Sequence, residues 1–334
     1  MKHLMNFPLS AETLLFYPDL STVCKEAGCD GLEVVWGGEA LPSNVPQALH
    51  VGYHLTFFPD WLDSWLEDTQ ALERKFGAPE VWQEFYGGIN GRETLLSLYR
   101  ADLERAVAWG AEYVVFHVSD VSLEEGYTYQ WLHTHQRVLE AAADVINCLL
   151  AGKEWPFAFL MENQWWPGLT LTSPAQTQYL LDAVHYENKG LLLDTGHLMN
   201  ANLDLHTQEE AVAYIHRMLD EHGTLASQIR GIHLHQSLSG DYVKANTGHL
   251  PDGWEKEPSY LGRFSASYGH VLKIDRHEPF TCPEVARIVD QIHPEWLVHE
   301  LSDLRREVKI ARTKRQIRAL EEGFTHMKKH TDYV

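Results

Sequence analysis

Eight short apolar runs, each followed by a segment with a helical period, alternate along this chain of 334 residues. The predicted strands cover residues 4–9, 31–36, 50–57, 113–118, 157–162, 190–194, 230–235 and 296–301. The predicted helices cover residues 18–27, 61–76, 92–110, 130–151, 174–185, 207–222, 283–292 and 304–329. Alternating strands and helices are the signature of parallel βα units, and eight such units can close into a barrel. We therefore expect an α/β fold, a single (β/α)8 barrel domain over residues 1–334.

Two stretches that follow predicted strands are longer than ordinary connections, one at about 58–91 and the other at about 236–274. Both would hang over the C-terminal rim of the barrel, where the active sites of such folds lie. Long loops of a barrel are usually functional, so we expect a lid or a substrate-binding role. The alternatives are a decorative insertion and a contact between subunits.

Metal-binding types of side chain stand at or just after the ends of the apolar runs. They are His54, His117, Glu162, Asp194, His197, His233, Asp275, His277 and Glu300. A buried strand should end in an apolar residue or a turn former, not repeatedly in His, Asp or Glu. Parallel strands that end in this way would bring their ligands to one rim of a barrel. Imidazole and carboxylate together suit Zn, Mn or Fe, so the pattern predicts a metal-dependent enzyme.

Asp194 and His197 form the segment DTGH at the end of an apolar strand, where they could give one ion two ligands of different charge. The alternative is an Asp that caps the next helix and a His on the surface. Asp275 and His277 form DRH, and alternate spacing places both side chains on one side of an extended segment. Taken alone, this second pair would fit an exposed charged loop.

Glu162 and Glu300 are the candidate catalytic residues, because each carboxylate ends a strand where burial is costly without a cation. They could bridge metals or act as acid and base. We expect Asn163 to orient Glu162 from outside the ligand shell. The alternative for Glu300 is an ion pair with the Arg305–Arg306 pair.

His233 and His235 share parity in the strand GIHLHQ, so both could face the barrel interior. With His233 as the ligand, we expect His235 to support the ligands from outside their shell or to contact substrate. A single His in a strand is more often a hydrogen-bonded core residue than a ligand, and twenty histidines make chance placement a real risk. Order and spacing along the chain therefore carry more weight than number. Trp165 and Trp166 fall in a predicted loop, where they could line a substrate pocket.

The net charge of −20 weighs against duplex DNA as a partner, because the phosphate backbone would be repelled. Bound cations would reverse that field locally. No apolar run approaches the roughly 20 residues that span a bilayer, and the first residues show no signal peptide. Four cysteines without a CxxC pair fit a reducing compartment, so we expect a cytoplasmic protein.

The order of these residues resembles the xylose isomerase-like TIM-barrel superfamily, also called AP endonuclease family 2. Its sugar epimerases hold one divalent metal with Glu, Asp, His and Glu, and the resemblance assigns these roles to Glu162, Asp194, His233 and Glu300. The endonuclease IV group adds further ligands. The matching residues here are His54, His117, His197, Asp275 and His277. The DRH tripeptide after the GIHLH strand is what makes the metal site most similar to that group, and the resemblance implies three zinc ions.

The chain departs from the endonuclease IV pattern in three places. HVS stands where HPG is expected, EPF stands where GEG is expected, and the spacer between His233 and Asp275 is much longer. The resemblance therefore implies a retained metal centre, without the loops that recognise DNA.

Three hypotheses follow. The first is a hydrolase of a phosphoester other than duplex DNA, with two or three divalent ions such as Zn, Mn or Fe. The second is a sugar or sugar-phosphate isomerase or epimerase with a single ion, in which Glu162 and Glu300 move protons and the extra histidines contact substrate. The third is a binding protein on a decayed barrel, which the complete ligand set argues against. The last predicted helix is also a candidate contact for a homo-oligomer.

Overall fold

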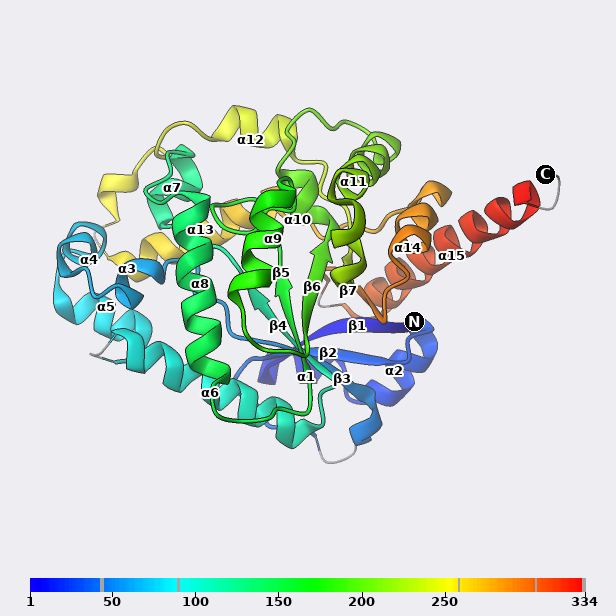
Figure 1. Ribbon diagram of the computed structural model, residues 1–334, viewed down its shortest axis with the longest axis horizontal. Coiled ribbons are helices and arrows are strands. Elements are labelled where there is room, and N and C mark those ends of the chain that lie inside the picture. The colour runs from blue at the N-terminus through cyan, green and yellow to red at the C-terminus, as the bar shows by residue number, and fades with distance from the viewer. Residues whose placement is uncertain (43–44, 89–90, 258, 304, 332–334) are drawn as a thin grey trace.

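Eight parallel strands form a closed barrel in which β1 pairs with both β2 and β8 in this computed structural model (Figure 1). The structure describes residues 1–42, 45–88, 91–257, 259–303 and 305–331. The strands are β1 (Lys2–Leu9), β2 (Gly31–Trp36), β3 (His50–His54), β4 (Tyr113–His117), β5 (Ala158–Glu162), β6 (Lys189–Asp194), β7 (Ile229–Leu234) and β8 (Trp296–His299). The predicted (β/α)8 barrel is confirmed, and each predicted strand overlaps an observed one.

Helices surround the barrel on the outside (Figure 1). Those that overlap predicted helices are α2 (Leu20–Ala27), α3 (Leu62–Trp65), α4 (Thr69–Phe76), α6 (Gly91–Trp109), α8 (His135–Leu150), α9 (Pro174–Ala183), α11 (Gln208–His222), η4 (Pro283–Val285), α14 (Ala286–Ile292) and α15 (Arg306–Thr331). Additional helical segments are α1 (Ala11–Phe16), α5 (Pro79–Tyr86), α7 (Leu123–Thr128), α10 (Thr195–Asn200), α12 (Gly240–Asn246), α13 (Tyr260–Ile274), η1 (Gln47–Leu49), η2 (Gly223–Gln228) and η3 (Trp254–Lys256).

Local chemistry explains where several helices begin and break. Thr207 and Glu210 form a capping box at the start of α11, in which each side chain accepts a backbone N–H of the other residue. The predicted helix 61–76 is divided into α3 and α4, because Glu67 has a left-handed φ of 58° between them. The predicted start of the last helix, residue 304, lies outside the described residues.

The inside of the barrel is filled by alternate residues of its strands. One apolar cluster contains Val115 of β4, Leu160 of β5, Leu192 of β6 and Val298 of β8. Successive residues of a strand point to opposite faces, so the residue two positions further along each of these strands also points inward. Those positions are the C-terminal strand ends, where a barrel opens to its active site.

The two long stretches after β3 and β7 fold into helices that pack on each other. Residues 58–91 carry α3, α4 and α5, and residues 236–274 carry α12, η3 and α13. The rings of Phe76 and Tyr260 stack at 4.2 Å, and those of Phe85 and Phe264 meet edge to face at 5.5 Å. In Figure 1, α3, α4, α5 and α13 lie at the left of the barrel and α12 lies at the top, although residues 89, 90 and 258 lie outside the description.

The last helix, α15, is tied to the barrel by polar contacts of its inner face. Gln316 donates to the carbonyl of Leu234 at 2.8 Å and accepts from the N–H of Phe280 at 2.7 Å. Lys309 donates to the backbone carbonyl of Asn6 at 2.7 Å. The C-terminal turns of α15 extend away from the barrel (Figure 1). Throughout the described part of the chain, no helix combines the length and the apolar character that crossing a membrane requires.

Candidate metal centre

All nine predicted ligands lie at the C-terminal end of the barrel, where they form three adjoining groups together with His235, for which a place outside the ligand shell or a contact with substrate is expected from the sequence. The first group is His54, His117 and Glu162, the second is Glu162, Asp194, His233 and Glu300, and the third is His197, His235, Asp275 and His277. In each group the ligand atoms lie within 4.8 Å of one another. Five of these side chains continue the inward alternation of their strands, since they stand two positions after Val115, Leu160, Leu192, Gly231 and Val298.

The first group is built from the ends of β3, β4 and β5. Oε2 of Glu162 lies 3.3 Å from Nε2 of His54 and 2.9 Å from Nε2 of His117. The two imidazole nitrogens are 3.0 Å apart. Tetrahedral ligands with bonds of about 2.0–2.1 Å are separated by roughly 3.3 Å, so these three atoms have the spacing of ligands around one ion.

The second group uses the other oxygen of the same carboxylate. Oε1 of Glu162 lies 3.3 Å from Nδ1 of His233. The same nitrogen lies 3.0 Å from Oε2 of Glu300 and 3.7 Å from Oδ2 of Asp194. Glu162 therefore stands between two groups and presents one oxygen to each of them.

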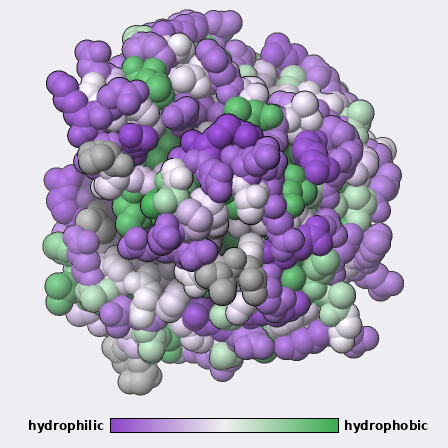
Figure 2. All heavy atoms as spheres, turned by 90° about the vertical axis from the view of Figure 1, so that its left-hand side faces the viewer, coloured by the Kyte–Doolittle hydropathy of each residue, from purple (hydrophilic) through white to green (hydrophobic). Residues whose placement is uncertain are grey.

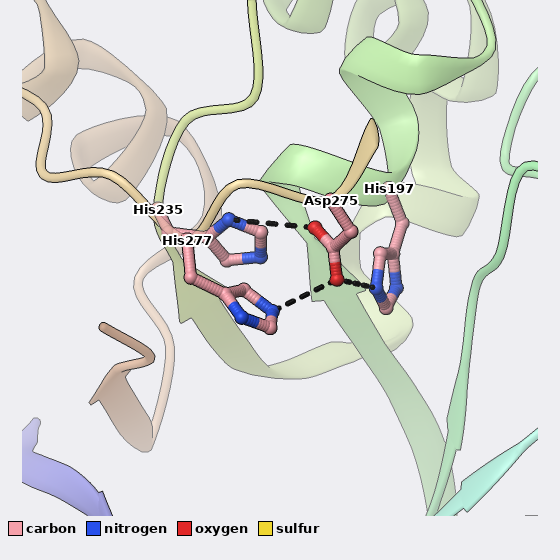
Figure 3. Close-up of side chains that lie close together, drawn as sticks. All are labelled: His197, His235, Asp275 and His277. Carbon is pink, nitrogen blue, oxygen red and sulfur yellow. Dashed lines mark hydrogen bonds and ion pairs between the residues drawn. The ribbon is translucent and has the colours of Figure 1, made fainter. Parts of the chain in front are cut away.

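The third group surrounds Asp275, which lies between His197 on one side and His235 and His277 on the other (Figure 3). Oδ2 of Asp275 is 3.2 Å from Nε2 of His197 and 2.9 Å from Nε2 of His277. Oδ1 is 3.9 Å from Nδ1 of His235, whose Nε2 lies 2.9 Å from Asp194 of the second group. His277 has a left-handed φ of 47°, a strained conformation for a residue other than glycine.

Hydrogen bonds outside the groups fix the orientation of several imidazoles. Nδ1 of His54 donates to the carbonyl of Leu55 at 2.9 Å, and Nδ1 of His197 donates to the carbonyl of Asn163 at 2.9 Å. In the neutral rings the remaining Nε2 then carries a lone pair that faces a carboxylate. Metal-bound histidines are held in this way by backbone carbonyls.

Glu33 is a functional residue that the sequence reasoning missed. It lies in the middle of β2, fully buried, and accepts a hydrogen bond from Nε2 of His233 at 3.0 Å. It also accepts one from the hydroxyl of Tyr113 at 2.8 Å. This leaves the Nδ1 lone pair of His233 directed at the second group. The signal in the sequence is a lone carboxylate inside the apolar run GLEVVW.

The groups fit divalent cations because buried oxygens in them lack hydrogen bonds. Among the described residues, neither oxygen of Glu162 nor Oε2 of Glu300 has a hydrogen-bond partner, and neither does Nδ1 of His233. The side chain of Glu162 is fully buried. Unpaired buried carboxylates are costly, and lone pairs that face one another repel unless positive charge stands between them. Mixed imidazole and carboxylate donors suit Zn, Mn or Fe.

The pKa values of the ligand side chains also indicate that the site requires positive charge. Burial alone would lower the pKa of His54, but Glu162 raises it to about 9. Burial also lowers the pKa of His277, and Asp275 outweighs it and raises the value to about 9. Burial raises the pKa of Glu162, whereas His117 and His233 hold it well below its usual range. Protons can thus occupy the places that cations would take, and binding a metal would release them.

The alternatives raised for single residues meet mixed outcomes. Asp194 does cap α10, since its Oδ1 accepts the N–H of His197 at 2.6 Å, but His197 is buried and not on the surface. The alternative of an ion pair for Glu300 is wrong, because Arg305 pairs with Asp303 and Arg306 pairs with Glu26.

The residues predicted to support the ligands also lie at the centre. Asn163 does not bond the carboxylate of Glu162, and its amide instead holds the backbone N–H and carbonyl of Asp194 at 2.8 and 3.1 Å. The expectation for Asn163 was therefore wrong in its partner. Trp165 is buried with its ring 5.1 Å from that of His197, and the ring of Trp166 lies 4.2 Å from that of Trp165.

Comparisons with known proteins agree with the barrel. A family model described as xylose isomerase-like TIM barrel matches residues 22–330. Among solved structures, the chain is similar to a D-tagatose 3-epimerase-like protein, with 14% identity, 96% of this chain and 99% of that chain covered, and a TM-score of 0.50. It is also similar to the IOLI protein with a binding zinc atom, with 14% identity, coverage of 98% and 97%, and a TM-score of 0.49.

A third similar structure is L-ribulose 3-epimerase, with 13% identity, coverage of 97% and 96%, and a TM-score of 0.49. The D-tagatose 3-epimerase-like protein, with 14% identity and a TM-score of 0.50, shows a shared fold and nothing finer. No curated protein sequence matches the chain. The resemblance of the ligand order to the endonuclease IV group stays a prediction.

Proposed function

The chain belongs to the xylose isomerase-like TIM-barrel family, and from this premise we propose that it is a metal-dependent phosphoesterase. It would hold two or three divalent ions, Zn, Mn or Fe, in the three groups described above. Its substrate would be a phosphoester other than duplex DNA, given the net charge of −20.

The observation that carries this proposal is the position of Glu162. Its two oxygens face two different groups, with His54 and His117 on one side and His233 on the other. A buried carboxylate that serves two adjoining groups is suited to bridging two cations. Paired ions stabilise the attacking and leaving oxygens of a phosphoryl transfer, which an isomerisation does not require.

Within such a site the two glutamates would have different tasks. Bound cations would neutralise the charge on the phosphoryl oxygens and lower the pKa of a water molecule. Glu162 is fully buried and would hold the cations together, whereas the side chain of Glu300 is 15% exposed and can reach a reacting water. We assign Glu300 the acceptance of a proton as water adds to phosphorus, and the return of that proton to the ester oxygen as the P–O bond breaks and the alcohol leaves. Trp165 and Trp166 would limit the access of bulk water.

A sugar or sugar-phosphate isomerase or epimerase is the second candidate. The group of Glu162, Asp194, His233 and Glu300 is complete by itself, and two carboxylates on one ion could move protons between neighbouring carbons. The comparisons support this candidate more than the hydrolase, since an epimerase-like protein shares the fold. The first and third groups, by contrast, favour the hydrolase.

The metal content per chain separates the two candidates. Elemental analysis of protein purified without chelator should give two or three ions per chain for the phosphoesterase. Screening would then use phosphomonoesters and phosphodiesters. A single ion per chain would favour the isomerase and direct the screen to ketoses and their phosphates.

A substitution in the third group gives an independent test. His277→Ala should remove about one ion per chain and lower phosphoesterase activity by roughly 100-fold or more, because a ligand is lost and not only an outer partner. The exposed His185→Ala is the matched control and should change neither value. Unchanged metal content in His277→Ala would refute the assignment of a third ion.

A further inference from the structure

A cavity lies next to the metal centre, and its lining differs chemically from the ligands. It has a volume of about 310 Å³ and lies between α7, α13 and the segments that follow β3 and β5. Its walls include Phe57, Tyr127, Trp166, Phe264 and Val271. The walls are therefore mainly aromatic and apolar, unlike the imidazoles and carboxylates beside them.

The cavity and the metal centre share a wall. The ring of Phe57 lies 4.4 Å from the ring of His117 on one side and stacks at 6.4 Å with Trp166 on the other. Trp166 contacts Trp165, which in turn lies 5.1 Å from His197. None of the ligands lines the cavity itself, so the rings of Phe57 and Trp166 are the apolar groups through which a molecule at the ligands would reach it.

The volume limits what the cavity can hold. An apolar cavity of about 150 Å³ binds benzene, so about 310 Å³ fits a bicyclic or substituted ring. Apolar pockets with a few polar groups are typical of small-molecule sites. The hydroxyl of Ser267 and Nε2 of His270, both buried residues of α13, line the cavity without a hydrogen-bond partner among the described residues. They could bond one or two heteroatoms of a ring, but the many hydroxyls of a sugar would lose water without replacement.

We propose that this cavity binds an aromatic or heteroaromatic group of the substrate, so that the enzyme acts on esters that carry such a ring. That the substrate is a phosphoester rests on the proposed function, whereas the binding of a ring is inferred from the cavity alone. The surface on this side of the molecule is mainly hydrophilic with small hydrophobic patches (Figure 2), so the binding site belongs to the cavity and not to a broad apolar face.

Three probes can be titrated calorimetrically into the metal-loaded protein. They are methylphosphonate, 1-naphthylmethylphosphonate and the neutral 2-naphthol. We expect the naphthyl phosphonate to bind at least about tenfold more tightly than methylphosphonate, because even a single methylene changes recognition by roughly 10-fold or more. Equal binding of the two phosphonates would overturn the proposal.

Substitutions on α13 show where the ring binds. Ser267→Phe should fill the cavity and abolish the naphthyl advantage while leaving methylphosphonate binding unchanged. Ser265→Phe adds the same ring at an exposed position of the same helix and should change nothing. If Ser267→Phe does not fold, Gly126→Leu replaces it, since a Cβ there would meet no atom within 4 Å. A naphthyl advantage that survives the filling variant would refute the assignment.

The neutral probe separates the two proposals. If 2-naphthol and the naphthyl phosphonate bind and Ser267→Phe prevents both, while methylphosphonate does not bind, the ring site stands and the phosphoesterase proposal fails. If both phosphonates bind equally and 2-naphthol does not bind, the ring site fails and the phosphoesterase proposal stands.

Discussion

The cluster of buried charge around Lys75 and the metal centre are neutralised in different ways. Around Lys75, the ammonium lies 2.6 Å from Asp60 and 2.7 Å from Asp63, and all three side chains are less than one tenth exposed. In the metal centre, no lysine or arginine of the described residues forms an ion pair with Glu162, Asp194, Asp275 or Glu300. Among the residues that the structure describes, the ion-pair partners of these four carboxylates are all imidazoles.

The difference shows which cluster is structural. The Lys75 cluster contains its own cation, and Asp120 beside it accepts the backbone N–H groups of Trp61 and Leu62 at 2.9 and 2.8 Å. Its charges therefore hold α3 and α4 against the barrel. The metal centre has excess carboxylate that only protons or added cations can balance. A cluster that depends on an external cation is the one suited to chemistry.

Removing the shared carboxylate should have the largest effect. Glu162→Gln keeps the shape of the side chain but removes the charge that two groups use. We expect the loss of ions from both groups and a decrease in activity of roughly 1000-fold, above the 10- to 100-fold effects of outer partners. Metal analysis and initial rates on the same preparation test this. Glu104→Gln, on the exposed side of α6, should behave like the wild type.

Removing the internal cation should affect stability and not metal binding. Lys75→Met leaves Asp60 buried without its partner, whereas Asp63 keeps His133 at 3.1 Å, and breaking a buried pair costs about 3–5 kcal/mol. Urea unfolding measures the loss, and metal content at low temperature should be unchanged. The exposed Lys25→Met should stay within about 0.5 kcal/mol of the wild type. Lost metal in a folded Lys75→Met protein would show that the two clusters are coupled.

The pH dependence of that variant has a definite sign. Burial raises the pKa of Asp60, and Lys75 counteracts the rise. Without Lys75 the pKa of Asp60 should rise further, so the folded variant would bind more protons than the unfolded chain. Its stability deficit should therefore be smaller near pH 5 than near pH 8. A deficit that does not vary with pH would mean that Asp60 is not the group left unpaired.

Much of the site could be predicted from the sequence because side chains alternate between the two faces of a strand. Ligands such as His117 and Glu162 end parallel strands, and their neighbours two positions back, Val115 and Leu160, already fill the barrel. Strand order and alternation are enough to place such residues on one rim. By contrast, the partner of Asn163 depends on how the chain turns after β5, which no spacing rule specifies.

The helices of the long stretches were harder to predict. The sequence of α13, YLGRFSASYGHVLKI, contains two glycines and two serines, which have low or intermediate helix propensity. The helix forms because Ser259 caps it and its rings pack on Phe76 and Phe85. Tertiary contacts of this kind override local propensity and are invisible in a single segment.

Substitution of Glu33 should have the smallest effect, and it tests most directly the difference between the Lys75 cluster and the metal centre. Like Lys75, Glu33 is a buried charge supplied by the chain, but it acts on the metal centre through the Nε2–H of His233. Glu33→Gln keeps an oxygen that can accept this hydrogen bond and removes only the negative charge. Because outer partners raise the basicity of a ligand, zinc affinity should fall about 10- to 100-fold. Competition with a chelating dye measures this affinity.

The control is Glu112→Gln, a substitution of a half-exposed glutamate just before β4. If zinc affinity is unchanged while stability falls, Glu33 stabilises the barrel core, as Lys75 stabilises the packing of α3 and α4. Glu33 would then be a structural charge and not part of the metal centre.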